Sequence, residues 1–428
     1  MRWQVILVLL FIASCTPSEI REPYSEIKVY FCPEDACLDR IMEQIDNSSE
    51  IKCAFYELNL PELISKLKEK NAEVIIEDST SEGEFRTGRS YALMHNKFCV
   101  FDNRTVMTGS MNPTERDNYS NNNNIVFIES DHLAENYLAE FEEFDNGIYG
   151  KGDEVKYPVI FSGEIKIENY FCPEDSCKLH VINALRGANS SVYFMDFSFT
   201  DEDIGNLLWN KDYEGLDVKG IMETRQAADY SRYDDLREFT ILDNNPYTMH
   251  HKVFIIDRKI VITGSYNPTE NANENNDENI LIIHDEKTAE KFIAEFERLY
   301  EFEETMPNAA GGIILYRIMY DAEGADEGKE YVEIKNTGNS TIDLGYYFLS
   351  NSKTNSRLSG KLGPGGTTKI EPSFALKNSE GILLLKKSQQ VIDYVYWEGM
   401  WNLRADEGEA LLRTDPYPIS GSSWKNVQ

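Results

Sequence analysis

Two short segments of the chain carry the same residue types, and together these could act on a phosphate ester. His95 and Lys97 stand two positions apart, and His250 and Lys252 repeat that spacing. On a β-strand, side chains two positions apart point to the same face, so each imidazole can act beside an ammonium group. Cleaving a phosphodiester takes a nucleophile, a proton donor and cations that support the phosphoryl oxygens. The doubled pattern supplies all three.

We expect one imidazole to attack phosphorus while the other protonates the leaving oxygen and later activates water. Each segment is followed by a serine and an asparagine that we expect to donate hydrogen bonds to the phosphate, namely Ser110, Asn112, Ser265 and Asn267. We count Asp102 and Asp257 with the catalytic set. Their place at the far ends of their strands favours a structural role, tying down the loops that carry the site.

The two segments belong to a long internal repeat. The run 108–115 aligns with 263–270 at a constant offset of 155 residues, and the same offset relates the two histidines. The Phe-Cys-Pro-Glu-Asp segments at 31–35 and 171–175 are 140 residues apart. The difference between the offsets places a net insertion in the second copy, before its histidine.

Each copy has the pattern of an α/β unit. Apolar runs predict strands at 51–58, 74–76, 98–101 and 125–128, and at 191–199, 216–222, 253–256 and 280–283. A helix is expected over 60–70. An amphipathic helix closes each copy, with apolar faces formed by Ala134, Tyr137, Leu138 and Phe141 and by Ala289, Phe292, Ile293 and Phe296. We expect the two units, 26–158 and 159–303, to pack about a pseudo-two-fold axis and form one catalytic unit.

The doubled His-x-Lys-x4-Asp pattern with its Gly-Ser-x-Asn companion resembles the phospholipase D superfamily, over roughly residues 26 to 303. That family includes phospholipases D, cardiolipin synthases and some nucleases. The resemblance implies a two-step mechanism through a covalent phosphohistidine, without metal or cofactor.

The family usually carries an acidic residue before the next strand, which orients a catalytic imidazole. Glu278 fills that position in the second copy, whereas Asn123 stands there in the first. In relatives this acid tends to pair with the histidine of the opposite half. The resemblance therefore predicts that Glu278 orients His95 and raises its basicity, so that His95 is the nucleophile and His250 the acid. Only one imidazole is expected to have a carboxylate partner at that position.

The other polar residues near the motifs are expected to have minor roles. The asparagine runs at 121–124 and 271–276 are expected to form turns, with one asparagine in each reaching the phosphate. His251 is expected to be incidental. Three further histidines are expected to be surface or packing residues, His132, His180 and His284.

The N-terminus predicts export. Arg2 precedes the apolar run Val5–Ala13, which is too short to span a bilayer. The run ends in Ile12-Ala13-Ser14-Cys15, which resembles a prokaryotic lipobox. It predicts a signal peptide over 1–14, lipidation of Cys15 and a tether over 15–25, with the protein anchored at the cell surface. An ordinary cleaved signal peptide with a chance cysteine is the alternative.

The remaining cysteines fit an oxidising compartment. Two pairs with the same spacing are favoured as local disulfides over metal ligands, because no histidine cluster accompanies them: Cys32 with Cys37, and Cys172 with Cys177. Cys53 and Cys99 lie in apolar runs and are expected in the core, with a third pairing left open.

After a linker over 304–312 the pattern changes to short strands without helices. The strands, at 313–319, 330–335, 346–350, 367–370, 381–385 and 391–397, predict an immunoglobulin-like β-sandwich over 313–428. The runs 326–336, 342–346, 391–393 and 408–413 resemble the lamin-tail domain. A targeting or adhesive module and a passive spacer both remain open. The acidic stretch 321–330 could bind a cation, but its pattern names no metal.

The net charge of the chain limits the classes of substrate that it can bind. Acidic residues outnumber basic ones by 74 to 42, a net charge of −32, which repels phosphate-rich polymers at long range. Any phosphate site must then be a local basic island. We favour a monomeric, general phosphodiesterase of phospholipase D type, and the sequence leaves open whether its substrate is a phospholipid or a nucleic acid. The alternatives are a secreted non-specific endonuclease and a catalytically silent surface-binding protein.

Overall fold

The computed structural model describes residues 20–81, 83–88, 92–228, 230–243, 245, 247–300, 312–322, 329–351, 354–378, 381–387, 390–397, 403–414 and 424–427. The expected lipidation site at Cys15, nearly all of the linker and most of the acidic stretch 321–330 lie outside these residues. Within the described ranges, no helix is long and apolar enough to cross a membrane.

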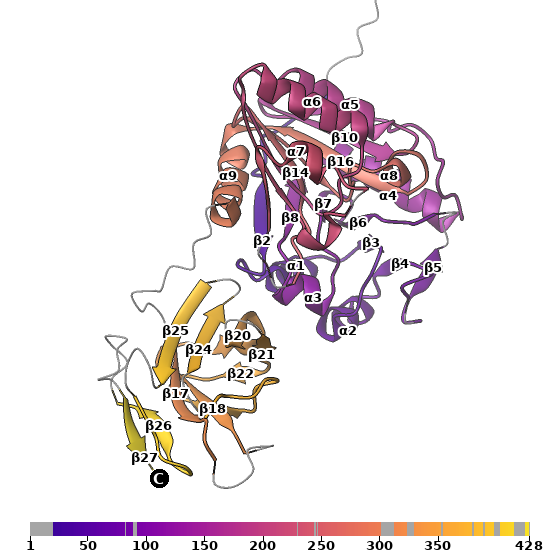
Figure 1. Cartoon of the computed structure of the whole chain (residues 1–428). Helices are drawn as coiled ribbons and strands as arrows, with labels where there is room; N and C mark the ends of the chain where they lie inside the picture. The colour runs from indigo at the N-terminus through magenta and orange to yellow at the C-terminus, as the bar shows by residue number, and fades with distance from the viewer. Residues whose placement is uncertain are drawn as a thin grey trace, which may run out of the picture.

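The first half is built on a seven-stranded sheet with the order β2-β8-β7-β6-β3-β4-β5 (Figure 1). Its strands are β2 (Lys28–Cys32), β3 (Ile51–Phe55), β4 (Glu73–Glu77), β5 (Arg86–Gly88), β6 (Lys97–Phe101), β7 (Thr105–Gly109) and β8 (Asn123–Glu129). Its helices are α1 (Cys37–Asp46), α2 (Pro61–Glu69), α3 (Glu115–Tyr119) and α4 (Asp131–Asp145). Helix α2 begins at a proline, which needs no backbone partner in the first turn.

The second half is built on a nine-stranded sheet with the order β1-β9-β10-β16-β15-β14-β11-β12-β13. Its strands are β1 (Ile20–Glu22), β9 (Val159–Ser162), β10 (Ile165–Cys172), β11 (Ser191–Asp196), β12 (Asp217–Met222), β13 (Thr240–Leu242), β14 (Lys252–Ile256), β15 (Ile260–Gly264) and β16 (Glu278–His284). Its helical segments are α5 (Cys177–Arg186), α6 (Glu202–Tyr213), η1 (Thr224–Gln226), α7 (Tyr233–Leu236), α8 (Glu270–Glu274) and α9 (Glu286–Tyr300).

Two details of the second half refine the sequence prediction. Residues 20–22 were expected in a tether, but they form β1, which pairs in parallel with β9 and extends the sheet of the second half. The net insertion before the second histidine folds largely as η1 and α7, between β12 and β14.

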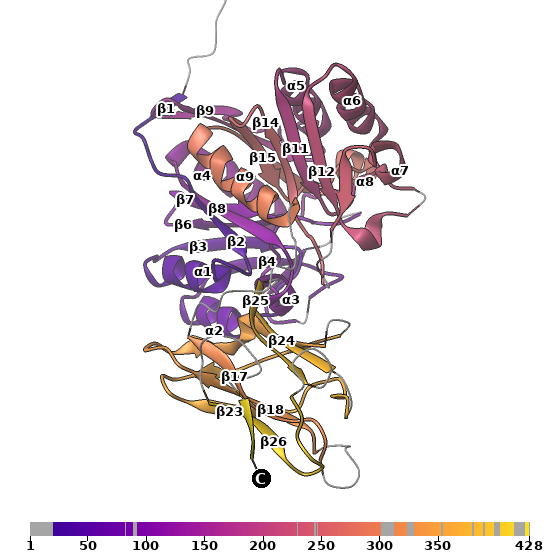
Figure 2. The ribbon, with the colours of Figure 1, turned by 60° about the vertical axis from the view of Figure 1, so that its left-hand side comes forward.

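Helices α4 and α9 lie between the two sheets (Figure 2). The predicted apolar faces supply a shared core, in which Tyr137 and Phe141 of α4 and Phe292 and Phe296 of α9 are at most 2% exposed. Strands from both sheets contribute to the same cluster. The two halves are therefore joined through one continuous apolar core, which fixes how their strand ends face each other.

Three disulfides brace the two sheets. The predicted local pairs Cys32–Cys37 and Cys172–Cys177 are formed, each between a strand end and the helix after it. The third, left open by the sequence, joins Cys53 of β3 to Cys99 of β6 directly across the antiparallel ladder.

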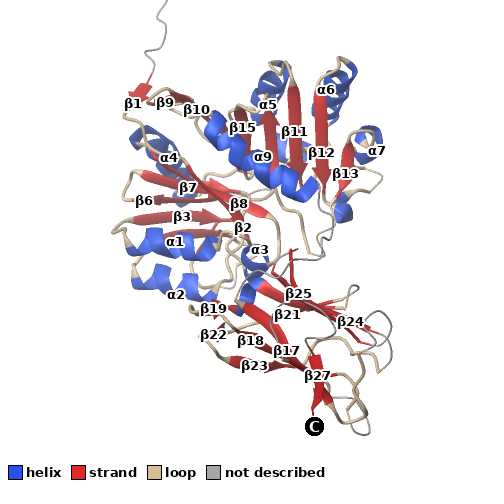
Figure 3. Ribbon diagram, turned by 90° about the vertical axis from the view of Figure 1, so that its left-hand side faces the viewer, coloured by secondary structure: helices blue, strands red, loops and turns tan. Residues whose placement is uncertain are grey.

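The C-terminal region is all-β among its described residues (Figure 3). A five-stranded sheet (β23-β18-β17-β26-β27) and a four-stranded sheet (β21-β20-β24-β25) share one core that includes Leu349, Trp397 and Leu411. The elements are β17 (Ile313–Met319), β18 (Tyr331–Asn336), β19 (Ile342–Asp343), η2 (Leu344–Tyr346), β20 (Tyr347–Ser350), β21 (Asn355–Arg357), β22 (Lys361–Leu362), β23 (Thr367–Ile370), β24 (Gly381–Lys387), β25 (Gln390–Trp397), β26 (Ala410–Arg413) and β27 (Trp424–Val427). The all-β prediction is confirmed, while the immunoglobulin-like and lamin-tail assignments stay predictions.

Candidate active site

Both motif histidines line one cleft of about 930 Å³. The same cleft is lined by Asn112 of the first half and Asn267 of the second. The sequence predicts this convergence of two imidazoles from separate halves.

Main-chain hydrogen bonds between the halves hold the two histidines in place. The amide of His95 donates to the carbonyl oxygen of Asp277 at 2.9 Å, and the amide of His250 donates to that of Asn122 at 2.8 Å. Each partner lies in the asparagine-rich loop of the opposite half. The position of each imidazole is therefore set by the junction between the copies.

The imidazole of His95 is paired with a carboxylate. Its Nδ1 lies 2.8 and 2.9 Å from the two carboxylate oxygens of Glu278, a fully buried residue that also accepts from the Ser265 hydroxyl at 2.7 Å. Because an ionised carboxylate only accepts, Nδ1 carries the proton and Nε2 keeps its lone pair. The pairing predicted for Glu278 is present.

The imidazole of His250 has two polar partners. Its Nδ1 lies 2.9 Å from Oδ1 of Asn123 and 3.4 Å from Oδ2 of Asp117. The amide nitrogen of Asn123 donates to the carbonyl oxygens of Asp117 and Asn121, which turns its oxygen toward the ring. At the position compared in the two copies only His95 has a carboxylate partner, as predicted, but the sequence did not reveal that Asp117 brings a second carboxylate to His250 from elsewhere.

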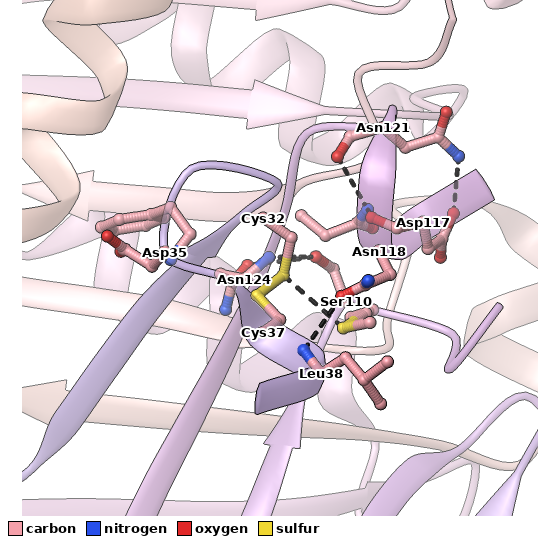
Figure 4. The surroundings of a disulfide bond; sticks show 12 residues. Cys32, Asp35, Cys37, Leu38, Ser110, Asp117, Asn118, Asn121 and Asn124 are labelled. Carbon is pink, nitrogen blue, oxygen red and sulfur yellow. Dashed lines mark hydrogen bonds between the residues drawn. A yellow bond between two sulfur atoms is a disulfide. The ribbon is translucent and has the colours of Figure 1, made fainter. Parts of the chain in front are cut away.

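Asp117 is held firmly on the short helix α3. It accepts from the backbone amide of Asn112 at 2.7 Å and from the side chain of Asn121 at 2.5 Å, beside the Cys32–Cys37 disulfide (Figure 4). Burial opposes ionisation, but His250 and these hydrogen bonds lower the pKa of Asp117 below its usual value. The signal for it was in the repeat, because Ala272 occupies the same offset in the second copy.

The two motif lysines lie beneath the histidines. Nζ of Lys97 donates to the carbonyl oxygen of His95 at 2.6 Å, and Nζ of Lys252 donates to that of His250 at 3.0 Å. Both side chains are almost wholly buried and do not line the cleft itself. They provide positive charge directly below the imidazoles, and these two buried ammonium groups are the core of the expected basic island.

Two aromatic residues were missed in sequence. Tyr56 lies edge-on to His95 and Phe197 edge-on to His250, each with ring centroids 4.9 Å apart. Each ring also contacts the lysine of its own half. The strands predicted through 58 and 199 end at Phe55 and Asp196, so these rings turn into the cleft.

Burial dominates the protonation of the four motif bases. Burial lowers the pKa of His95 to about 4 and outweighs Glu278, which acts in the opposite direction. Burial and then Lys252 lower the pKa of His250 to about 4, against Asp117. Burial also lowers the pKa of Lys97 to about 7 and that of Lys252 to about 8. Glu278 does raise the pKa of His95, as predicted, but burial lowers that pKa by more.

The four predicted phosphate-binding residues divide into two kinds. The amide oxygens of Asn112 and Asn267 have no hydrogen-bond partner in the described structure, and both residues line the cleft. Ser110 and Ser265 are fully buried, and their hydroxyls bond Asn124 and Glu278 instead. The prediction that the serines bind phosphate is corrected, because Ser265 holds Glu278, the partner of His95, and Ser110 holds Asn124, which contacts the buried His251.

The catalytic role assigned to Asp102 and Asp257 is also corrected, because both have a structural role. Asp102 accepts from the backbone amides of Ser49 and Glu50. Asp257 accepts from the backbone amides of the run 189–191. Neither lines the cleft. They bind the preceding loops at the far ends of β6 and β14, which is the structural role that their position favours.

The asparagine run 121–124 and His251 are more important than expected. All four asparagines are at most 4% exposed, and the last two begin β8. His251 is fully buried and its Nε2 lies 3.1 Å from Glu295. In the second run, Asn271 and Asn276 line the cleft. Three histidines lie outside the cleft with local partners, as expected: His132 with Glu22, His180 with Tyr170 and His284 with Glu168.

Comparison with known proteins points to the same two segments. A family model described as "Cardiolipin synthase, PLD-like domain" matches residues 25–144 and 181–300. The chain is 33% identical over 132 residues to a phospholipase D of Rickettsia felis, covering 30% of this chain and 66% of that protein. It is 33% identical over 131 residues to the human mitochondrial cardiolipin hydrolase, covering 30% and 52%. The chain thus spans at most about two thirds of these relatives.

Among solved structures, Nuc from Salmonella typhimurium, a phospholipase D family member, is 29% identical with a TM-score of 0.31, covering 32% of this chain and 95% of that one. The names of the curated relatives support a hydrolase at the coarse level of the superfamily.

Proposed function

This chain belongs to the family of PLD-like domains, and on that premise we propose that it is an exported phosphodiesterase that works through a phosphohistidine. One observation carries the proposal. Two imidazoles from opposite halves line the same cleft, and each has its Nδ1 hydrogen-bonded to a residue of the other half, Glu278 or Asn123. Both Nε2 atoms are thereby left for the substrate.

His95 is the proposed nucleophile. Its Nδ1–H donates to a buried carboxylate, which increases electron density at Nε2 and stabilises the cation that forms on attack. In the first step, Nε2 bonds to phosphorus and the bond from phosphorus to the leaving oxygen breaks. His250 transfers its proton to that oxygen, so the alcohol leaves neutral.

The second step reverses the proton transfer. His250, now neutral, removes a proton from water while the water oxygen bonds to phosphorus and the P–N bond to His95 breaks. His250 is suited to the acid role because an amide, rather than a carboxylate, makes its shorter hydrogen bond. Asp117, at 3.4 Å, stabilises the imidazolium that must be present before the first step. The anionic substrate adds to that effect.

The phosphate is expected to lie between the two cleft asparagines. The amides of Asn112 and Asn267 can turn their nitrogens toward the phosphoryl oxygens, because their present oxygens have no partner to lose. Lys97 and Lys252 neutralise the charge from below. The pairwise arrangement suits one tetrahedral anion approached from two sides.

We propose a phospholipid-type substrate. Among the described residues that line the cleft, Arg116 carries the one permanent positive charge, against Glu57, Asp117 and Glu270. A nuclease that tracks a polyanion needs a row of cations along its groove. This cleft offers one compact site instead. The expected lipid anchor at Cys15 would hold the enzyme at a membrane surface, and three disulfides fit an exported chain. The lamin-tail assignment of the β module remains a proposal.

Purified protein beginning at residue 20 should be incubated separately with phosphatidylcholine vesicles and with plasmid DNA, with His95→Ala as the matched control. Release of the headgroup by the wild type alone supports the proposal. Cleavage of DNA but not lipid, with a steep loss on adding salt, would reassign the protein as a nuclease. A third outcome, no turnover of either substrate or of a nitrophenyl phosphodiester, would identify a silent binding protein.

A further inference from the structure

Three carboxylates from both halves meet at a second place in the junction. Glu140 and Glu143 of α4 and Glu174, which follows β10, each direct one oxygen into a group whose atoms lie within 4.8 Å of one another. None of the three pairs with a lysine or arginine within the described parts of the chain. Burial raises the pKa of Glu174 to about 7 and that of Glu140 well above its usual value.

The internal repeat supplies a comparison for this cluster. At the symmetry-related place, Glu295 of α9 and Glu34, which follows β2, occupy the positions of Glu140 and Glu174. Between them lies the guanidinium of Arg298, 2.8 Å from Glu295 and 3.1 Å from Glu34. That half therefore holds a cation where the carboxylates converge.

The equivalent of Arg298 in the first half is Glu143. The substitution replaces a resident cation by a third anion. The equivalent of His251, whose Nε2 contacts Glu295, is Asn96, which offers Glu140 a single hydrogen bond at 3.4 Å. The second cluster thus holds a guanidinium between its two carboxylates, whereas the first has a third carboxylate in that place and an amide in place of the imidazole.

Glu140 is the residue that makes this arrangement costly. It is only 5% exposed, and its second carboxylate oxygen has no hydrogen-bond partner among the described residues. An ionised carboxylate buried without a counter-charge is strongly destabilising. Glu143 and Glu174 are partly exposed, so an ion can reach the group from solvent.

We propose that Glu140, Glu143 and Glu174 bind one structural Ca²⁺ at the junction of the two halves, in the place that Arg298 occupies in the pseudo-symmetric site. Oxygens up to 4.8 Å apart fit an ion with Ca–O distances of about 2.3–2.6 Å. Mg²⁺ binds at about 2.0–2.1 Å and demands a near-ideal octahedron, which three side chains from two segments suit poorly.

The ion would act on stability and takes no part in the hydrolysis. The nearby backbone is already organised around the cluster, since Glu143 accepts from the amide of Asp153 and Asp277 accepts from that of Gly150. The segment after α4 is thereby tied to Glu143 and to Asp277 of the second half. A bound ion would join α4, the loop after β10 and this segment.

Thermal unfolding of the disulfide-intact protein in EDTA, in CaCl₂ and in MgCl₂, with calorimetric titration of CaCl₂, tests the proposal. We expect one ion per chain, and a rise in the unfolding midpoint of roughly 3–5 °C at a hundredfold excess over the dissociation constant. Glu143→Gln and Glu174→Gln should lose this response. Glu142→Gln is the matched control, because it removes an equal charge from the exposed face of α4 and should keep it.

Glu143→Arg makes the test reciprocal, because it places in the first half the residue that the second half carries. This variant should unfold at a higher temperature than the wild type in EDTA and should ignore calcium. Equal midpoints for the wild type in EDTA and CaCl₂ overturn the proposal and indicate that the carboxyls share protons. Equal stabilisation by MgCl₂ overturns the assignment to calcium, and a calcium response that survives in Glu143→Gln overturns the site.

Discussion

The two copies share a backbone but distribute their charges differently. In the second copy, Glu278 begins β16 and Ala272 lies on α8. In the first copy the carboxylate has moved, with Asn123 beginning β8 and Asp117 on α3. As a result His95 hydrogen-bonds a carboxylate directly, whereas His250 bonds an amide and has its carboxylate farther away. A symmetric fold thus supplies one better nucleophile and one better acid.

The strongest test of this difference between the halves is to replace each motif histidine in turn. His95→Asn and His250→Asn should each lower kcat on an alkyl phosphodiester by about 10⁵-fold, as for other groups that act as a unit. A nitrophenyl diester separates them, because nitrophenolate leaves without a proton. His250→Asn should then give a burst of nitrophenolate and a stable phosphoenzyme, whereas His95→Asn gives neither.

Peptide mapping of the trapped intermediate is the direct measurement. Phosphate on residue 95 in the His250→Asn protein agrees with the assignment. A burst from the His95→Asn protein instead, with phosphate on His250, would reverse the two roles while leaving the shared cleft intact.

The two carboxylates should differ in the size of their effect. Glu278→Gln should lower kcat by about 10³-fold, because the imidazole of His95 is no longer held in the orientation and tautomer that attack requires. Asp117→Asn should cost about tenfold, since Asn123 still orients the ring of His250. Steady-state kinetics on both substrates measures this, with Glu270→Gln at the cleft edge as a charge-matched control. Equal losses for the two variants would show that the halves are functionally alike.

The first half also differs in how its central strands are tied. Cys53 and Cys99 are bonded across β3 and β6, whereas Phe194 and Phe254 are opposite each other on β11 and β14. The bridge closes a separation of 46 residues, so Cys53→Val with Cys99→Val should cost about 2–4 kcal/mol of unfolding free energy. Chemical denaturation measures it, and activity at low temperature should persist. A loss of activity without a loss of stability would place the bridge in the chemistry instead.

The features that recur along the chain could be predicted from its sequence. Periodic apolar runs placed α2 over Pro61–Glu69 and the buried strands within a few residues, and the doubled motif placed both histidines in one cleft. Such features are visible because hydrophobic alternation and a fixed offset are properties of the chain itself. The same offset should have revealed Asp117, since it differs from Ala272, but an aspartate on a short polar segment looks like an ordinary helix start.

What the sequence could not show depends on three-dimensional proximity across the junction. Ser265 looks like a phosphate donor until Glu278 is seen to accept from its hydroxyl. Tyr56 looks like part of a strand until the ladder is seen to end before it. The pairing of Cys53 with Cys99 required the register of β3 against β6. In each case the competing choices are equally compatible with local pattern, and only the packed arrangement decides between them.

The smallest expected difference between the halves lies in their lysines. Burial lowers the pKa of Lys97 to about 7 and that of Lys252 to about 8, so Lys97 is the first to lose its positive charge as the pH rises. A phosphodiester binds less well to a neutral amine, and KM should therefore rise several-fold between pH 6.5 and 8.5. The effect should be larger on kcat/KM than on kcat, because bound phosphate favours the charged lysine. Lys97→Arg, which stays charged, should flatten the lower part of this profile, and Lys252→Arg only the upper part. A KM that is constant over this range in the wild type would mean that both ammonium groups remain charged despite their burial.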